Sequence, residues 1–499
     1  MTRRCRVAVP VTALALLLTL PAGAGLRDEI EVEIRRAQLS DATVGVSVRD
    51  AETGAVLVDY NAGELMIPAS NLKLFTSGAA LHVLGPRFEF RTRAIIDGER
   101  LVIVGDGDPG FGDPELLELM QVGDRTGLGV EEFLQMWVTA AREAGIHHLA
   151  AVTVDDRVFD RHFVHASWPA DQLNRRYCAE VTGFNFHGNV LHCYPRPGQG
   201  HRPDVQLFEP AASWLAIINR ATNSSGPHDR NDVWIARRKD TNELTFYGNV
   251  KFPYKTPTPV TAHNMPEFFA RLLADRLEAA GILVDGWGVA DPSAPPATGQ
   301  VLAPLVATPI STVLTRCNRD SQNLYAEALL KRVGHALTNE PGSWINGAAV
   351  VRHVVHERLN NSNLAVKLVI HDGSGLSREN RVAAATVTAW LNTFHNDERL
   401  GELFIDSLAE AGRSGTLSKR FRDVDLHGTT VQGKSGYIRS VSCLSGYVTA
   451  PNQQRRSFAI LINGLDKAGS VAEAKRLQER ILADIAWDMT ATVSVMGGE

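Results

Sequence analysis

Three short groups of residues in this chain carry the side chains that acyl transfer through a serine requires. In Ser70-Asn71-Leu72-Lys73 a hydroxyl precedes an amine by three residues, so both share one face if the segment is helical. A serine hydroxyl is a weak nucleophile without a base, and a lysine kept neutral by burial can be that base. None of the other nine lysines follows a serine at this spacing. The alternative is a helix-capping serine with an exposed lysine one turn later.

The other two groups lie much later in the chain. Ser321-Gln322-Asn323 opens an expected helix, where the hydroxyl could relay a proton and the carboxamide could bind a peptide amide. Lys434-Ser435-Gly436 lies in an expected strand, where the lysine supplies positive charge, the serine can bind an anionic terminus and the glycine admits a substrate backbone. Either group alone would be explained by capping or by chance. Their order along the chain is what favours catalysis.

Hydrophobic periodicity and turn residues predict the elements that hold these groups. Apolar residues at helical spacing and alternating runs bounded by turns separate helices from strands. We expect helices over 28–39, 70–83, 265–280, 310–333, 342–359 and 470–487, and strands over 43–49, 55–60, 429–436, 442–450 and 457–464.

The distribution of these elements predicts an interrupted domain. Residues 25–95 and 300–499 together supply the helices and strands of one α/β (α+β) domain. Residues 96–299 consist of short β-like runs and turns, and we expect them to form inserted β-rich domains, with a further small subdomain at about 200–258. The chain has 499 residues, which is long enough for such domains to bury separate cores.

The ordered groups resemble the penicilloyl-serine acyltransferase superfamily of penicillin-binding proteins and serine β-lactamases. Ser321 comes 251 residues after Ser70, too far for a β-lactamase but similar to the class C low-molecular-mass penicillin-binding proteins, which are D-alanyl-D-alanine carboxypeptidases and endopeptidases. Further segments also look characteristic of that family, among them Asp372-Gly373-Ser374-Gly375 and Ser445-Gly446-Tyr447. The resemblance implies a penicillin-binding/serine β-lactamase-like transpeptidase domain, with the inserted domains between its first and second motifs.

The resemblance also implies a mechanism. Ser70 would attack the carbonyl of the penultimate D-alanine of a peptidoglycan stem peptide and form an acyl-enzyme that water hydrolyses. Lys73 would be the base, Ser321 would pass a proton to the leaving amine, and Asn323 would hold the substrate amide. β-Lactam antibiotics would acylate the same serine as covalent inhibitors. The implied function is a serine-type hydrolase of the cell wall that needs no cofactor and no metal.

The third motif is implied to bind the end of the substrate. Lys434 would supply positive potential and Ser435 would bind the terminal carboxylate beside Gly436, while the backbone N–H groups of Ser70 and Tyr437 would form the oxyanion hole. Tyr437 departs from the family, which has a small hydroxyl residue there, and this departure bears on carboxylate binding. Arg439 shares its strand face and could compensate, or could be a surface charge.

Two positions outside the motifs match the family's readers of the diaminopimelate side chain. Asp155 lies in the insertion and Arg378 follows the Asp-Gly-Ser-Gly segment. An acid and a base together would suit a zwitterionic group. The alternative is that they form local ion pairs or stabilise turns.

Other classes of protein fit the sequence less well. His353 and His356 lie one turn apart but do not match a zinc-protease motif, and no Gly-x-Ser-x-Gly elbow is present. The balance of 51 basic and 56 acidic residues provides no basic face for nucleic acid. Two alternatives stay open: a weak or inactive peptidoglycan-binding homologue, and a β-lactamase or esterase of the same superfamily.

The first 24 residues have the pattern of a cleaved signal peptide. Three arginines precede an apolar run that ends at Ala22-Gly23-Ala24, and no later segment is long and apolar enough to be a transmembrane anchor. The protein is therefore expected to be periplasmic or secreted. Export permits disulfides, so Cys178 and Cys193 could pair across a hairpin or could be two buried thiols.

Overall fold

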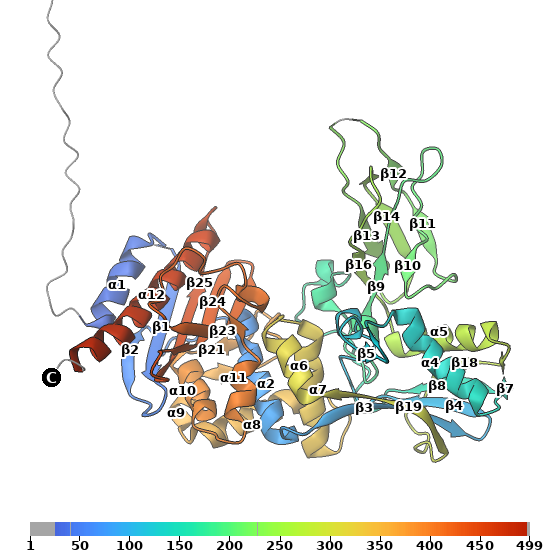
Figure 1. Cartoon of the computed structure of the whole chain (residues 1–499), viewed down its shortest axis with the longest axis horizontal. Coiled ribbons are helices and arrows are strands. Elements are labelled where there is room, and N and C mark those ends of the chain that lie inside the picture. The colour runs from blue at the N-terminus through green and yellow to red at the C-terminus, as the bar shows by residue number, and fades with distance from the viewer. Residues whose placement is uncertain (1–24, 40, 227, 497–499) are drawn as a thin grey trace, which may run out of the picture.

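The structure is a computed structural model that describes residues 25–39, 41–226 and 228–496. The expected signal peptide lies outside these residues. Two bodies lie side by side, and a β-rich arm projects from the second (Figure 1). The first body contains both ends of the described chain and all three motifs, and we refer to it as the catalytic domain, while the second is built from the insertion.

A six-stranded antiparallel sheet forms the centre of the catalytic domain. The strands lie in the order β2 (Val56–Tyr60), β1 (Thr43–Asp50), β25 (Arg455–Asn463), β24 (Val441–Thr449), β23 (Thr430–Ile438) and β22 (Ala409–Glu410). All nine residues of β24 are buried, because helices cover both faces of the sheet. Alternate residues point to opposite faces, so Cys443 and Tyr447 join one core while Leu444 and Val448 join the other.

The helices on the two faces come from distant parts of the chain. On one face α1 (Leu26–Arg36) packs beside the long terminal helix α12 (Ser470–Met496). The other face contacts a larger group, in which α2 is buried from Lys73 to Leu81. This group consists of α2 (Lys73–Leu84), α6 (Ile310–Asn318), α7 (Asn323–Thr338), α8 (Trp344–Leu359) and α10 (Ala384–His395).

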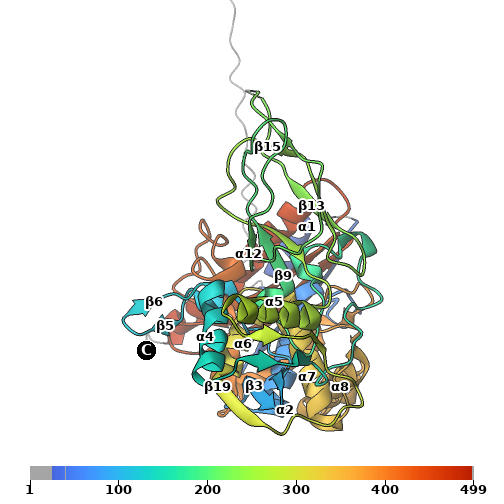
Figure 2. The same cartoon turned by 90° about the vertical axis from the view of Figure 1, so that its right-hand side faces the viewer.

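The insertion has its own sheet and core. Its five strands lie in the order β18 (Trp287–Val289), β8 (Ala151–Asp155), β4 (Arg100–Val104), β3 (Glu89–Asp97) and β19 (Gln300–Pro309). Helices α4 (Val130–Glu143) and α5 (Met265–Ala279) pack together on this sheet, as Figure 2 shows. Strands β3 and β19 pair with each other, so the inserted sheet includes residues 89–95 and 300–309, which the sequence analysis assigns to the catalytic domain.

The arm comprises residues 190–261. At its base an antiparallel sheet has the order β10 (Phe208–Glu209), β9 (Val190–Cys193) and β16 (Thr258–Thr261). Beyond it lie β11 (Ile217–Asn219), β14 (Leu244–Tyr247) and β13 (Trp234–Arg237), and the pair β12 (Thr222–Asn223) and β15 (Asn249–Val250).

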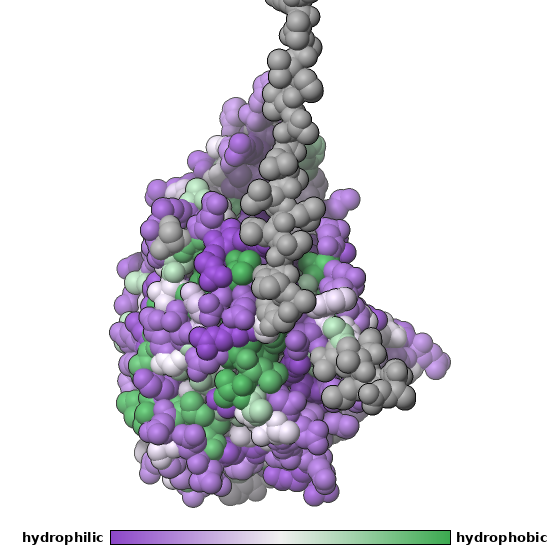
Figure 3. Space-filling view, turned by 90° about the vertical axis from the view of Figure 1, so that its left-hand side faces the viewer, coloured by the Kyte–Doolittle hydropathy of each residue, from purple (hydrophilic) through white to green (hydrophobic). Residues whose placement is uncertain are grey.

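The remaining elements are short. They are α3 (Pro114–Leu117), α9 (Ser362–Ala365), α11 (Gly401–Asp406), β5 (Gln121–Val122), β6 (Arg125–Thr126), β7 (His148–Leu149), β17 (Leu283–Val284), β20 (Leu368–Val369) and β21 (Arg381–Val382), with 3-10 turns η1 (Ala69–Leu72), η2 (Ala170–Gln172), η3 (Arg176–Cys178), η4 (His187–Asn189) and η5 (Gly415–Leu417). The end of the catalytic domain near α1 and α12 has a mainly hydrophilic surface with separate apolar areas (Figure 3). Within the described ranges, no helix combines the length and the apolar character of a membrane span.

Two local expectations have clear outcomes. The helix predicted over 310–333 is two helices, because Ser321 adopts a left-handed conformation (φ 61°) between α6 and α7. Cys178 and Cys193 are free, buried thiols, so the possible bridge between them does not form. Burial raises the pKa of each thiol to about 12.

Candidate active site

The first and second motifs line one cavity of about 1110 Å³, and the third motif borders it through Tyr437, the residue that follows it, and through the bond from Lys434 to Ser321. Ser70, Ser321 and Asn323 line it from the catalytic domain, and Tyr437 lines it from the end of β23. Tyr177 and its neighbours in the insertion close another side. The cavity therefore lies between the catalytic domain and the insertion.

Ser70 occupies the 3-10 turn η1, directly before the buried helix α2. Two glycines let other segments approach this turn closely. A Cβ atom on Gly375 (φ 82°) would lie 1.8 Å from the Ala69 carbonyl oxygen, and a Cβ atom on Gly436 would lie 3.1 Å from the Ser70 nitrogen. Any larger residue at either position would displace the turn that presents the Ser70 hydroxyl.

Lys73 is fully buried beside Ser70. Its Nζ donates to three acceptors: Ser70 Oγ at 3.0 Å, Asn323 Oδ1 at 2.7 Å and the Ser374 carbonyl at 2.8 Å. Burial lowers the pKa of Lys73 to about 8. A lysine so placed can lose the proton that faces Ser70 near neutral pH and then accept the hydroxyl proton.

The second motif connects the two lysines. Lys434 Nζ donates to Ser321 Oγ at 2.8 Å, while the Asn323 amide donates to the Tyr177 carbonyl at 2.8 Å. Burial, followed by the positive charge of Lys73, holds the pKa of Lys434 well below its usual value. The Lys434 amine is therefore hydrogen-bonded to the hydroxyl of Ser321, which lines the cavity.

Asn71 ties the first motif to the third. Its Nδ2 donates to the Lys434 carbonyl at 2.7 Å, and its Oδ1 accepts from Ser445 Oγ at 2.7 Å. These bonds fix η1 against β23 and β24. The Ser435 hydroxyl donates to Thr416 Oγ1 at 2.8 Å, so two hydroxyl groups stand together beside β23. Thr416 could not be identified from the sequence, because only the pairing of β22 with β23 brings its loop here.

The exposed residues at the cavity mouth include Tyr437, two arginines and two acids, Glu379 and Asp466. Tyr437 is 59% exposed, and it lines the cavity together with Arg439 and Arg378. Arg378 Nη1 donates to the Arg439 carbonyl at 2.7 Å, which keeps these two segments together. The departure at Tyr437 therefore lies at the cavity mouth and leaves the backbone of β23 in place.

Asp155 has a different position from Arg378. It ends β8 of the inserted sheet and is not among the residues that line the cavity. Arg157 holds it with Nε–Oδ1 and Nη2–Oδ2 contacts of 2.8 and 2.6 Å. Burial alone would raise the pKa of Asp155, but the hydrogen bonds from Arg157 lower it. This is the local ion pair that the sequence analysis gave as the alternative.

Comparisons with known proteins identify the family. A family model described as the D-Ala-D-Ala carboxypeptidase 3 (S13) family matches residues 26–483. The chain belongs to this family. It is 31% identical over 486 residues to a D-alanyl-D-alanine carboxypeptidase of Actinomadura sp. (strain R39), covering 92% of this chain and 86% of the relative. It is 24% identical to the D-alanyl-D-alanine carboxypeptidase DacB of Haemophilus influenzae, covering 87% and 88% of the two chains.

A solved structure agrees with the fold. The crystal structure of penicillin-binding protein 4 of Haemophilus influenzae superposes with a TM-score of 0.72 at 20% sequence identity, covering 91% of this chain and 99% of that one. The protein is therefore a serine-type D-Ala-D-Ala carboxypeptidase with the penicillin-binding fold.

Two buried carboxylates position the loop that accepts from Lys73 in this S13 carboxypeptidase. Glu327 accepts from the backbone N–H groups of Gly373 and Ser374, each at 2.8 Å, and Asp372 accepts from that of Gly375 at 2.9 Å. Burial, with the charge of Asp372, raises the pKa of Glu327 to about 7. Glu327 follows Asn323 by one turn of α7, which is the only signal for it in the sequence.

A buried ion network joins the insertion to the second motif of the S13 enzyme. Arg316 Nη2 lies 3.1 Å from Asp113 Oδ2, and its Nη1 lies 2.8 Å from Asp320 Oδ2. The Tyr325 hydroxyl donates to Asp113 Oδ2 at 2.5 Å. Because Asp320 precedes Ser321, the network fixes that motif against the insertion. Sequence reasoning missed it, since its partners are some 200 residues apart.

Proposed function

We propose that the enzyme removes the terminal D-alanine of peptidoglycan stem peptides through an acyl-enzyme on Ser70. The observation that carries this proposal is the 3.0 Å contact between Lys73 Nζ and Ser70 Oγ, in a cavity that Asn323 and Ser321 also line. These are the groups that a nucleophile, its base and a proton relay require. The same chemistry cuts a peptide cross-link when the leaving group is the amine of a second stem peptide.

In the acylation step, neutral Lys73 accepts the Ser70 hydroxyl proton as Oγ bonds to the carbonyl carbon of the penultimate D-alanine. The backbone N–H groups of Ser70 and Tyr437 stabilise the oxyanion. When the C–N bond breaks, the Ser321 hydroxyl gives its proton to the leaving amine and regains the proton that Lys73 took from Ser70, so that Lys73 is neutral again. Lys434 donates a hydrogen bond to Ser321 Oγ and supplies positive potential. Water then attacks the ester carbonyl, Lys73 accepts a water proton, and Ser70 Oγ leaves with a proton.

We assign the terminal carboxylate of the substrate to groups at and beside the cavity mouth. Ser435 and Thr416 present adjacent hydroxyls, and Lys434 lies buried behind them. Arg439 adds a guanidinium beside Tyr437, and an arginine pairs well with a carboxylate. Tyr437 replaces a small hydroxyl residue of the family, and we propose that Arg439 compensates by binding the terminal carboxylate.

For the substrate side chain we propose Arg378, which lines the cavity. Asp155 is the other expected reader, and its bidentate pair with Arg157 supports a structural role instead. Replacing Asp155 by alanine is then expected to leave the rate of D-alanine release unchanged, whereas Arg378→Gln raises KM for peptides with diaminopimelate more than for peptides with lysine.

We propose that β-lactams acylate Ser70 and that the enzyme acts outside the cytoplasmic membrane. The first follows from the same nucleophile and is supported by a solved complex of the Haemophilus influenzae protein with a β-lactam. The second rests on the signal-peptide pattern of residues 1–24 and on the location of the substrate.

The test is the release of D-alanine from purified pentapeptide muropeptides. Wild-type enzyme should release it and Ser70→Ala should not, with an exposed Ser293→Ala variant as matched control. In a parallel assay with benzylpenicillin, rapid release of penicilloate by an enzyme that releases no D-alanine from the muropeptides would instead show a β-lactamase. Absence of both products would show a binding homologue without turnover.

A further inference from the structure

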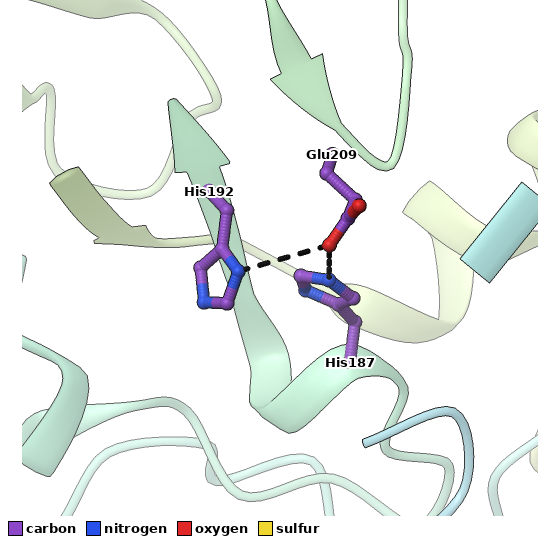
Figure 4. Close-up of side chains that lie close together, drawn as sticks. All are labelled: His187, His192 and Glu209. Carbon is purple, nitrogen blue, oxygen red and sulfur yellow. Dashed lines mark hydrogen bonds and ion pairs between the residues drawn. The ribbon is translucent and has the colours of Figure 1, made fainter. Parts of the chain in front are cut away.

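Two histidines and a glutamate converge at the base of the arm, in a place that the catalytic mechanism does not use. His187 comes from η4, His192 from β9 and Glu209 from β10 (Figure 4). One ligand atom from each residue lies within 4.8 Å of the others. None of the three lines the active-site cavity.

Strand pairing and a tight turn bring the three side chains together. Glu209 pairs directly with His192 in the antiparallel ladder of β10 and β9, so both side chains leave the sheet on one face. His187 precedes this ladder in a turn whose residues have left-handed backbones, with φ angles of 56° at His187 and 64° at Gly188. Such a conformation is costly for a residue with a side chain, and it directs the His187 ring towards Glu209.

The hydrogen bonds of His187 define which ring nitrogen is available. Its Nδ1 lies 2.9 Å from the Val190 carbonyl, and because a carbonyl only accepts, Nδ1 carries the proton. In the neutral ring Nε2 then presents a lone pair to Glu209 Oε1, at 3.3 Å. A backbone carbonyl that binds the far nitrogen of a histidine is the usual second partner of a metal-binding imidazole.

The second histidine, His192, lies near the same carboxylate without bonding to it. His192 Nδ1 lies 3.9 Å from Glu209 Oε1, which is too long for a hydrogen bond. Within the ranges that the structure describes, neither of its ring nitrogens makes a hydrogen bond. The His187 and His192 rings lie edge to face with centroids 4.6 Å apart, so both face the carboxylate from adjacent directions.

The distances fit a metal ion between the three groups. Ligands at about 2.0–2.1 Å from a tetrahedral zinc ion are about 3.3 Å from one another, which is the separation of His187 Nε2 and Glu209 Oε1. A small rotation of the exposed part of Glu209 or of His192 would shorten the longer contacts. Two imidazoles and one carboxylate are ligands for zinc and similar divalent transition metals, and they leave a fourth position for water.

We propose that His187, His192 and Glu209 bind one divalent transition-metal ion, with zinc as the best match. The ion connects η4, β9 and β10, and so fixes the base of the arm to the rest of the insertion. Because the ion binds the folded protein, it should raise the melting temperature. The Ser70 cavity is separate, so acylation of Ser70 should not require it.

The experiment uses the whole protein without a histidine tag, stripped with a chelator and then titrated with zinc or cobalt(II). We expect one equivalent of metal per chain, a cobalt absorption spectrum typical of four ligands, and a higher melting temperature. His192→Gln and Glu209→Gln should bind at least about tenfold more weakly. His201→Gln, which changes an exposed histidine of the same arm, should bind like wild type.

Acylation by a fluorescent penicillin shows that each variant is folded. If the stripped wild-type protein binds neither metal, or if both site variants bind as tightly as wild type, the proposal is wrong. In that case His187 and Glu209 form an ion pair that shares a proton.

Discussion

The pH dependence of Ser70 acylation follows from the burial of Lys73. Burial lowers the pKa of this amine to about 8, and only the neutral amine can accept the hydroxyl proton. At pH 7 about one-eleventh of the lysine is neutral, and at pH 9 about ten-elevenths, so acylation should be about tenfold faster at the higher pH. Below pH 7 the rate should fall about tenfold for each pH unit.

The assay is the second-order rate of acylation by benzylpenicillin, whose carboxylate stays ionised and whose side chain does not titrate in this range. It should be measured by stopped flow from about pH 6 to about pH 9. Lys73→Met should lose both the rate and its rise, whereas Lys419→Met, which changes an exposed lysine of the same domain, should keep both. A rate that is flat or falls between these limits would refute Lys73 as the base.

Three further predictions concern the groups around the nucleophile. Gly436→Ala should slow acylation at least about tenfold, because the new Cβ would lie 3.1 Å from the Ser70 nitrogen, and stopped flow measures this. Asp113→Asn should reduce stability by about 3 kcal/mol, measured by urea unfolding, because it leaves the buried charge of Arg316 with one partner fewer. Arg439→Gln should raise KM about tenfold for peptides with a free terminal carboxylate and not for their amides, measured by steady-state kinetics.

Each of these changes has a matched control. Gly288→Ala adds a methyl group where nothing lies within 4 Å, and Asp124→Asn and Arg422→Gln change exposed charges. Equal acylation rates for the Gly436 and Gly288 variants would contradict the close approach of β23 to η1. If the two aspartate variants are equally stable, the ion network around Arg316 does not stabilise the fold. If Arg439→Gln raises KM equally for peptide acids and their amides, Arg439 does not bind the terminal carboxylate.

The contact between Ser70 and Lys73 was predictable because their spacing is local. Ser70 and Lys73 are three residues apart, and the order of the three motifs predicted that one fold would unite them, as the contact between Lys434 and Ser321 shows. The strands around β24 were also predictable, because apolar runs bounded by turn residues are signals that a short segment of sequence contains.

What the sequence did not reveal depends on long-range pairing. The bond from Asn323 to Tyr177, and that from Tyr325 to Asp113, need the insertion folded against the helices. The break at Ser321 interrupts a helical pattern without a proline or glycine, so periodicity alone predicted one helix over 310–333, and only the second motif indicated that a helix begins there. Glu209 meets His192 only through the register of two short strands.

The central claim is that Ser70 forms the covalent intermediate. Its most direct test is peptide mapping by mass spectrometry after reaction with a penicillin. We expect one penicilloyl group per chain on the peptide that contains Ser70, and none in Ser70→Ala. An adduct on another residue, or no adduct on a folded wild-type protein, would contradict it.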